Sequence, residues 1–176
     1  MFNHTVIDRV DLAYLFSDLK HNIGAEIGVS KGKFSEVLLK ANPHLKLYCI
    51  DSWSPYDECP SQEKQDRCFE ETKKRLKNYN VVFIRKNSMD ALNDIPDSSL
   101  DFVYIDANHT FESVSEDIAG WTTKVKGGGI VSGHDYFHHP TRPIGVILAI
   151  DNFIKENKLQ LCTTNEKYPS WYFVKQ

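Results

Sequence analysis

The sequence predicts an α/β protein with a doubly wound, mostly parallel sheet of seven strands, and three observations predict it. Strand-like apolar segments alternate with helix-like amphipathic segments, which is typical of a parallel sheet covered by helices. The segment Leu100–Ile105 is nearly all apolar, as a strand buried on both faces should be. Near the end of the chain, two strand-like segments flank residues 165–170, a spacing that indicates an antiparallel hairpin.

The first half of the chain begins with a helix pattern. Apolar residues recur at helical spacing over residues 8–20, which predicts an amphipathic helix. The strand Ile23–Val29 follows, and Ser30 is the expected N-cap of a second helix, which Pro43 ends. The next predicted elements are a strand, a charged helix and a strand, at Leu45–Ile50, Ser61–Lys77 and Val81–Ile84.

The second half continues the alternation. A short helix around Met89–Leu92 precedes the strand Leu100–Ile105, and an apolar stripe from Phe111 to Trp121 predicts the next helix. Residues 127–129 are all glycine and are expected to form the turn before a fifth strand, Ile130–Gly133. The remaining predicted elements are a helix and the two hairpin strands, at Gly145–Glu156, Leu159–Thr163 and Trp171–Val174.

Length and composition limit the classes of protein that fit. A chain of 176 residues suits one domain, and its formal net charge of −3 does not suggest a surface that holds nucleic acid by its phosphates. The four cysteines form no C-x-x-C pair and fit no common zinc site. The longest apolar run, Val146–Ile150, cannot span a bilayer, and the N-terminus has no signal-peptide pattern. We therefore expect a cytoplasmic protein with no membrane partner.

Residues 26–32 read Glu-Ile-Gly-Val-Ser-Lys-Gly at the end of the first predicted strand. Dinucleotide sites have the pattern G-x-G-x-x-G, whereas here three residues separate Gly28 from Gly32 and an acid precedes them. That acid, Glu26, would repel a pyrophosphate and attract an ammonium group. Asp51, at the end of the second strand, can bind a ribose. Together they predict a ligand with a ribose at one end and a positive amine at the other.

Four acids stand at or near the ends of predicted strands: Glu26, Asp51, Asp106 and Asp135. Any one of them has an ordinary structural explanation, because Asp is common as a helix cap and in turns. Four carboxylates at one edge of a sheet, however, repel one another, and ligands or cations relieve such repulsion. We therefore expect this edge to be a binding site.

With these motifs the chain resembles the class I S-adenosylmethionine-dependent methyltransferases, over almost its whole length. The resemblance implies a Rossmann-like fold and one domain spanning residues 1–176. Within the class, the chain is similar to methyltransferase family 24, a small bacterial branch related to metal-assisted O-methyltransferases of the catechol type. The motifs that carry the resemblance are Glu26–Gly32, Cys49–Trp53, Asn87–Met89, Tyr104–Phe111 and Gly127–Tyr136.

The resemblance implies a binding site for S-adenosylmethionine. Glu26 and the Gly28–Gly32 backbone would hold the methionine part, and Asp51 would accept hydrogen bonds from the ribose hydroxyls. Trp53 would flank the adenine and Ser88 would meet its edge, although a core or loop-anchoring tryptophan fits position 53 as well. The implied cofactor-binding residues are Glu26, Gly28, Ser30, Gly32, Asp51, Ser52, Trp53, Ser88, Met89 and Asp106.

The resemblance also implies a reaction centre at Asp106, His109 and Asp135. Catechol-type enzymes deprotonate the acceptor with the help of a divalent cation, and Asp106 and Asp135 match two of its ligand positions. The third position is Tyr136, where the catechol pattern has an amide. His134 would give a mixed nitrogen–oxygen site instead, which favours Mn, Fe or Zn over Mg. For His109 three roles stay open: general base, metal ligand or cap of the following helix.

The segment after His134 contains further candidates. His138 and His139 extend a histidine cluster, for which a solvent-exposed loop is the favoured interpretation. Arg142 could bind an anionic substrate or lie along the surface. Because no sizeable substrate-binding insertion is present, we expect the N-terminal helix and the loops at residues 54–65 and 136–143 to supply the acceptor pocket.

The favoured hypothesis is an enzyme that transfers a methyl group from S-adenosylmethionine to a hydroxyl of a small metabolite, with a sugar as one candidate. The alternative is a binding module that keeps the cofactor pocket and catalyses nothing alone. A nicotinamide-dependent oxidoreductase fits the fold but not the glycine spacing. The acceptor, the metal and the oligomeric state stay open, with a homodimer as one option.

Overall fold

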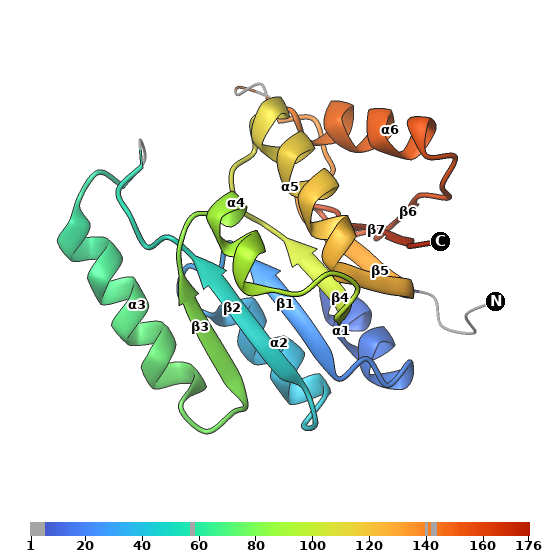
Figure 1. The fold of residues 1–176 in the computed structure, drawn as a ribbon. Coiled ribbons are helices and arrows are strands. Elements are labelled where there is room, and N and C mark those ends of the chain that lie inside the picture. The colour runs from blue at the N-terminus through green and yellow to red at the C-terminus, as the bar shows by residue number, and fades with distance from the viewer. Residues whose placement is uncertain (1–5, 57–58, 140, 142–143) are drawn as a thin grey trace.

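A computed structural model describes residues 6–56, 59–139, 141 and 144–176 (Figure 1). Its centre is a seven-stranded sheet in the order β3-β2-β1-β4-β5-β7-β6. The first five strands of this order are parallel, and β7 runs antiparallel to both of its neighbours. The strands are β1 Ile23–Ile27, β2 Lys46–Asp51, β3 Val81–Arg85, β4 Leu100–Ile105, β5 Val125–Gly133, β6 Cys162–Thr163 and β7 Trp171–Val174. This topology confirms the predicted fold class.

Helices cover both faces of the sheet, as Figure 1 shows. One face carries α1 (Arg9–Asp18), α2 (Lys33–Ala41) and α3 (Gln62–Leu76). The other face carries α4 (Ser88–Ala91), the short 3₁₀ helix η1 (Leu92–Asp94), α5 (Phe111–Lys124) and α6 (Val146–Glu156). No helix in the described ranges is long and apolar enough to cross a membrane.

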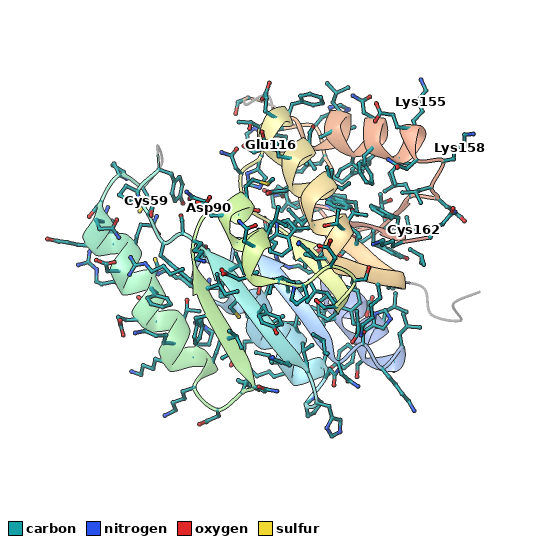
Figure 2. The ribbon with its side chains drawn as sticks, in the orientation of Figure 1. Cys59, Asp90, Glu116, Lys155, Lys158 and Cys162 are labelled. Carbon is teal, nitrogen blue, oxygen red and sulfur yellow. The ribbon has the colours of Figure 1, made fainter. Side chains whose placement is uncertain are left out.

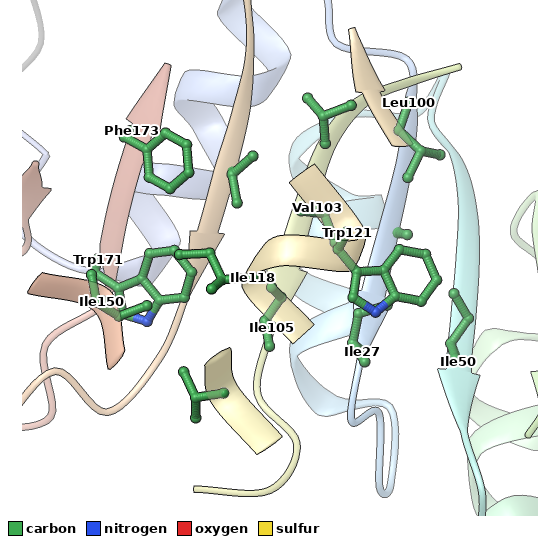
Figure 3. Close-up of a cluster of buried hydrophobic side chains, with 14 of the residues drawn as sticks. Ile27, Ile50, Leu100, Val103, Ile105, Ile118, Trp121, Ile150, Trp171 and Phe173 are labelled. Carbon is green, nitrogen blue, oxygen red and sulfur yellow. The ribbon is translucent and has the colours of Figure 1, made fainter. Parts of the chain in front are cut away.

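Two apolar clusters hold the layers together, one on each face of the sheet. In the cluster of Figure 3, Trp121 of α5 and Ile150 of α6 pack with strand residues such as Ile27 and with Trp171 of β7. Side chains alternate between the faces along each strand, so Ala25 and Ile27 belong to this cluster while Glu26 points to the opposite face. Glu26, the first of the predicted site residues, therefore lies on the face of the sheet that α1 and α2 cover.

The structure corrects several predicted element boundaries. The predicted strand Leu159–Thr163 is reduced to β6, Cys162–Thr163. Ser30 is not the N-cap of α2: that position is held by Gly32 at φ 67°, while Ser30 lies in the preceding turn at φ 49°. Residues 127–129 are not a turn but part of β5, which begins at Val125. Glycines fit there because the register with β4 shifts, and Gly128 and Gly129 pair with Lys175 instead.

The carboxyl ends of β1, β2, β4 and β5 meet at one edge of the sheet, which we call the rim. Backbone hydrogen bonds extend each strand into its loop there. The Gly28 amide donates to Ile50 O at 2.9 Å, and the Asp106 amide donates to Ile27 O at 2.7 Å. His134 N donates in turn to Ile105 O at 3.0 Å. These bonds fix where the first residue after each strand points.

Candidate active site

The turn after β1 requires glycine at position 28. Its φ is +89°, and a Cβ there would lie 2.0 Å from the backbone oxygen of Asp106. No side chain fits between the two loops at that distance, so the turn after β1 and the loop after β4 are in direct backbone contact. The close approach brings the Gly28–Gly32 turn beside the first residue that follows β4.

Asp51 joins the turn after β1 to the loop after β2. Its two carboxylate oxygens accept hydrogen bonds from the backbone amides of Ser30, at 2.8 Å, and Trp53, at 2.7 Å. The side chain is half-buried. Asp51 therefore lies against the glycine turn, in the place where the sequence analysis expects an acid to meet a ribose.

Glu26 lies deeper than the sequence suggests, with 2% of its surface exposed. Ser35 of α2 donates a hydrogen bond to its Oε2. Burial raises the pKa of Glu26 to about 8, and the nearby carboxylates of Asp106 and Asp51 add to this rise, while the bond from Ser35 opposes it. Glu26 is thus a largely neutral acid at pH 7 in the structure as it stands.

In the structure, Trp53 is a loop-anchoring core residue, the alternative to flanking an adenine. The side chain is fully buried at 4.4 Å from the ring of Phe69, and its Nε1 donates to Ser30 O at 2.8 Å. Its φ of 43° is unusual for a residue with a side chain. In this structure Trp53 anchors the loop after β2 and presents no exposed ring face to an adenine.

Ser88 is also bound to protein groups. Its hydroxyl donates to Asp117 of α5 and accepts from Trp121 Nε1 at 2.8 Å. Burial raises the pKa of Asp117 to about 6, although the bond from Ser88 opposes this shift. These contacts fasten α4 to α5. The neighbouring Met89 is 40% exposed, and Ser52 is half-buried with its hydroxyl accepting from Ser54 N at 3.3 Å.

Four titratable side chains converge where β4 and β5 end. His109 Nε2 lies 2.9 Å from Asp135 Oδ2 and 3.6 Å from Asp106 Oδ1. His134 Nδ1 lies 3.2 Å from Asp135 Oδ1 and 3.8 Å from Asp106 Oδ2. Ligand atoms of Asp106, His134 and Asp135 all fall within 4.8 Å of one another. The structure thus brings together the three residues predicted as the reaction centre and His134, which was predicted as a metal ligand with Asp106 and Asp135.

The carboxylates and imidazoles of this cluster shift one another's pKa values. His109 Nε2 is buried, yet the residues that the structure describes give it no hydrogen bond of good geometry. The carboxylates of Asp106 and Asp135 nevertheless raise the pKa of His109 to about 9. Burial would raise the pKa of Asp135, but the two imidazoles outweigh it and hold that pKa well below its usual range. A buried polar atom without a well-formed hydrogen bond is compatible with an ion or a water molecule at this cluster.

The structure also bears on the roles considered for three nearby residues, His109, Tyr136 and His138. Thr110, not His109, is the N-cap of α5, since its hydroxyl accepts from Ser113 N at 3.3 Å. Tyr136 donates its hydroxyl to Asp151 at 2.6 Å and so turns toward α6, away from the third ligand position of the catechol pattern. His138 is exposed.

Other predicted features lie outside the cluster. His139 accepts from Thr141 N at 3.2 Å and is absent from the group of ligand atoms that converge at the rim. Arg142 lies outside the described residues. The four cysteines are free thiols, and Figure 2 places Cys59 and Cys162 on opposite sides of the molecule.

Arg9 is a residue at the rim that the sequence analysis did not single out. It is the first residue of α1, and its guanidinium carbon lies 5.4 Å from the centre of the Phe34 ring at the start of α2. Phe34 packs in turn on Tyr104 of β4, with 4.3 Å between the ring centres. The helical spacing of Arg9 with the buried residues Leu12 and Ala13 is the signal that could have identified it.

Comparison with known proteins gives a family and a fold. A family model described as "Methyltransferase domain" matches residues 25–136. A curated protein of Sinorhizobium fredii, "Uncharacterized protein y4gI", is 25% identical over 119 residues. That match covers 64% of this chain but 12% of the relative, so the chain spans a small part of that protein's length.

Two solved structures are similar over nearly the whole chain. An O-methyltransferase family protein from Burkholderia thailandensis has a TM-score of 0.72 at 15% identity, covering 96% of this chain and 55% of that one. The O-methyltransferase TomG from Streptomyces achromogenes, solved in complex with S-adenosylmethionine, has a TM-score of 0.68 at 17% identity. That match covers 96% of this chain and 80% of TomG. At such identities the likeness shows a shared fold.

Proposed function

Because the chain belongs to the methyltransferase domain family, whose model matches residues 25–136, we propose that it transfers a methyl group from S-adenosylmethionine to a hydroxyl of a small metabolite. The observation that carries this proposal is the convergence of Asp106, His109, His134 and Asp135 beside the Gly28 turn. One end of the rim offers a cofactor site, and the other offers groups able to deprotonate a hydroxyl. The complex of TomG with S-adenosylmethionine supports the cofactor, because the two proteins share a fold.

The residues present fit the cofactor in two respects. The Gly28 turn, where a Cβ would strike the Asp106 backbone, provides the close backbone approach that a bound ligand needs. Asp51 is placed beside this turn with lone pairs available to two neighbouring hydroxyls. Glu26 and Asp106 would face the amine. Trp53 is assigned no contact with the adenine, because it is buried in the core.

The chemistry is an in-line displacement, in which the protein mainly positions and deprotonates the acceptor. S-adenosylmethionine supplies an electrophilic methyl group when bound; the carbon–sulfur bond breaks as the oxygen–carbon bond forms, and S-adenosylhomocysteine leaves. His109 Nε2 can accept the hydroxyl proton only in its neutral form, and because Asp106 and Asp135 raise the pKa of His109 to about 9, that form predominates only at alkaline pH. Asp135, 2.9 Å from that nitrogen, stabilises the resulting imidazolium.

A divalent cation fits the same cluster. The buried His109 Nε2 without a well-formed hydrogen bond, and the ligand atoms of Asp106, His134 and Asp135 within 4.8 Å of one another, are the observations that support it. These three residues would hold the cation, which would lower the pKa of the acceptor hydroxyl when bound. Two carboxylates with an imidazole suit Mn²⁺, Fe²⁺ or Zn²⁺ better than Mg²⁺.

Calorimetric titration with S-adenosylhomocysteine tests the cofactor site. We expect micromolar binding by the intact protein and none by Asp51→Ala, because position 51 would lose its contacts with the ribose and with two loop amides. Asp97→Ala is the matched control, since Asp97 is an exposed acid before β4, at the opposite edge of the sheet. An intact protein that gives no heat would exclude the proposed function.

Cation binding is tested with Mn²⁺ alone, followed by its electron paramagnetic resonance signal. We expect one bound ion, and at least a tenfold loss of affinity in Asp135→Asn, because a carboxylate ligand becomes a neutral amide. Asparagine tolerates the left-handed backbone at φ 59°, so the loop should keep its shape. Asp90→Asn, on α4 (Figure 2), is the control. Equal affinities in Asp135→Asn and the native protein would remove the cation from the proposal.

Methyl transfer itself separates the enzyme from the binding module. A screen of hydroxylated metabolites, sugars included, with labelled S-adenosylmethionine should give a methylated product whose formation Asp135→Asn abolishes. If the protein binds S-adenosylhomocysteine but methylates nothing alone, the binding module is the correct interpretation.

A further inference from the structure

Arg9 reaches the rim from an element that carries none of the predicted site residues. Helix α1 ends at Asp18, shortly before β1 begins, so it runs antiparallel to β1 and its first residue stands at the carboxyl edge of the sheet. Within α1, Arg9 shares a helical stripe with the buried residues Leu12, Ala13 and Phe16. The arginine side chain therefore lies over Phe34 of α2, and the residue is half-buried.

The backbone of Arg9 is held from two sides. Asp8 caps α1, accepting from Val10 N at 2.8 Å and from Asp11 N at 3.0 Å. Glu166, in the loop between β6 and β7, accepts from Arg9 N at 2.9 Å. The first turn of α1 is thus fixed against the hairpin loop, which preorganises the guanidinium above Phe34.

The guanidinium has an aromatic neighbour but no carboxylate partner. Its carbon lies 5.4 Å from the Phe34 ring centre, and no carboxylate of the described chain lies within ion-pair distance of it. The side chain is only partly exposed. An arginine held at the edge of a site without an acidic partner leaves a donor set that matches a planar carboxylate.

Arg9 and Glu26 together offer the two kinds of group that an amino-acid end of a ligand requires, a cation and an acid. Glu26, whose carboxyl is the candidate for the ligand's amine, is held on this face by Ser35 of α2, the helix whose Phe34 ring lies under the Arg9 guanidinium; of the influences on the pKa of Glu26, the lowering by Arg9 is the smallest. An α-amino group and an α-carboxylate share one carbon atom, so the acid that receives the first must have a cation or amide donor close by for the second. Arg9 provides that cation on the face of the sheet that carries Glu26.

We propose that Arg9 binds the α-carboxylate of the amino-acid end of S-adenosylmethionine. This inference rests on the proposed function, since it assigns a contact within the same cofactor site. A carboxylate could also come from an acceptor substrate, and the experiment separates the two sources. In either case the ligand chemistry is a carboxylate received by a guanidinium at the amino end of α1.

The test measures the binding of two ligands to the native protein and to variants at position 9. The ligands are S-adenosylhomocysteine and its decarboxylated analogue, which keeps the adenosine, the sulfur and the amine. The native protein should bind the analogue about 10- to 100-fold more weakly, the usual effect of losing one charge-assisted hydrogen bond. Arg9→Gln should bind both ligands with nearly the weaker affinity. Arg9→Lys should recover part of the difference, because it keeps the charge.

The control variant is Arg67→Gln, which removes an exposed arginine of α3 and should behave as the native protein. Thermal melting confirms that each variant is folded. If Arg9→Gln weakens both ligands equally, or weakens neither, Arg9 does not bind this carboxylate and the inference is overturned. If Arg9→Gln weakens the binding of neither ligand, the proposed function is unaffected. If the native protein binds neither ligand, the proposed function fails and the inference fails with it.

Discussion

At the scale of single residues, the burial of Glu26 changes its chemistry more than its position in the sequence suggested. The sequence analysis treats Glu26 as a charged group that attracts an amine. In the structure it is buried beside Ser35, and its pKa is raised to about 8 by burial first and by neighbouring acids second. An ammonium group brought beside it would favour the charged form and so lower this pKa.

Ligand binding should therefore release a proton from Glu26. At pH 7, below the pKa of the free protein and above that of the complex, binding of S-adenosylhomocysteine should release up to one proton. Affinity should rise with pH through about 8, the pKa of Glu26 in the free protein, and level off above it, once the free protein is ionised. Calorimetry at pH 7 in phosphate and in Tris, which differ in ionisation enthalpy, measures the proton count.

Glu26→Gln is the control for this linkage, because it keeps the shape and removes the titration. In that variant the binding enthalpies in the two buffers should agree. If they also agree in the native protein, Glu26 does not exchange a proton with the ligand's amine, and its role at the site is structural.

The sequence was enough to predict which side chains lie at the rim wherever the position along a strand decides it. Asp51, Asp106 and Asp135 follow strand ends, and a parallel sheet brings such ends together. The choice between the two roles of Trp53, flanking the adenine or anchoring the loop, was not predictable, because the backbone at position 53 is left-handed, at φ 43°, and the indole packs on Phe69. A loop sequence does not reveal which face of a side chain remains exposed.

At the scale of elements, the loops of the rim depend on backbone conformations that few residues adopt. Gly28 has φ +89° and touches the loop after β4, so a side chain at position 28 would separate two strands that form the site. The sequence indicated a glycine turn there. It did not show that Gly32 takes the N-cap of α2, since Ser30 is the better N-cap residue by type.

Gly28→Ala should be strongly destabilising. A Cβ 2.0 Å from Asp106 O combines a steric clash with backbone strain, and we expect a loss of more than about 2 kcal/mol in the free energy of unfolding. Urea denaturation measures it. Gly127→Ala is the matched control, because a Cβ at position 127 would meet nothing within 4 Å. Equal stabilities of the two variants would contradict the close approach of the Gly28 turn to the loop after β4.

The three consecutive glycines of β5 led to the incorrect prediction of a turn at residues 127–129. Residues 127–129 have the composition of a turn, yet they continue a strand that runs from Val125 to Gly133. The register beside β4 is irregular here, and the backbone of Lys175 provides hydrogen-bond partners for Gly128 and Gly129. Such partners lie far away in the sequence, so local composition cannot indicate them.

At the scale of the whole molecule, the strand order places β1 beside β4 at the centre of the sheet. Connections from these two strands leave to different faces, which opens the rim between them. The alternation of strands and helices was enough to predict this architecture. It did not predict how α1 returns to the rim and fixes Arg9 there, because that depends on contacts between α1 and residue Glu166, 157 positions away.

The central claim is that one groove at the rim holds a ribose at Asp51 and an amino-acid end beside Glu26. A crystal structure of the protein with S-adenosylhomocysteine tests it most directly. The account predicts ribose hydroxyls bonded to Asp51, the ligand's amine next to Glu26 or Asp106, and the sulfur facing the cluster that contains His109 and Asp135. A ligand bound elsewhere, with Glu26 still enclosed beside Ser35 and no opening next to it, would contradict the account.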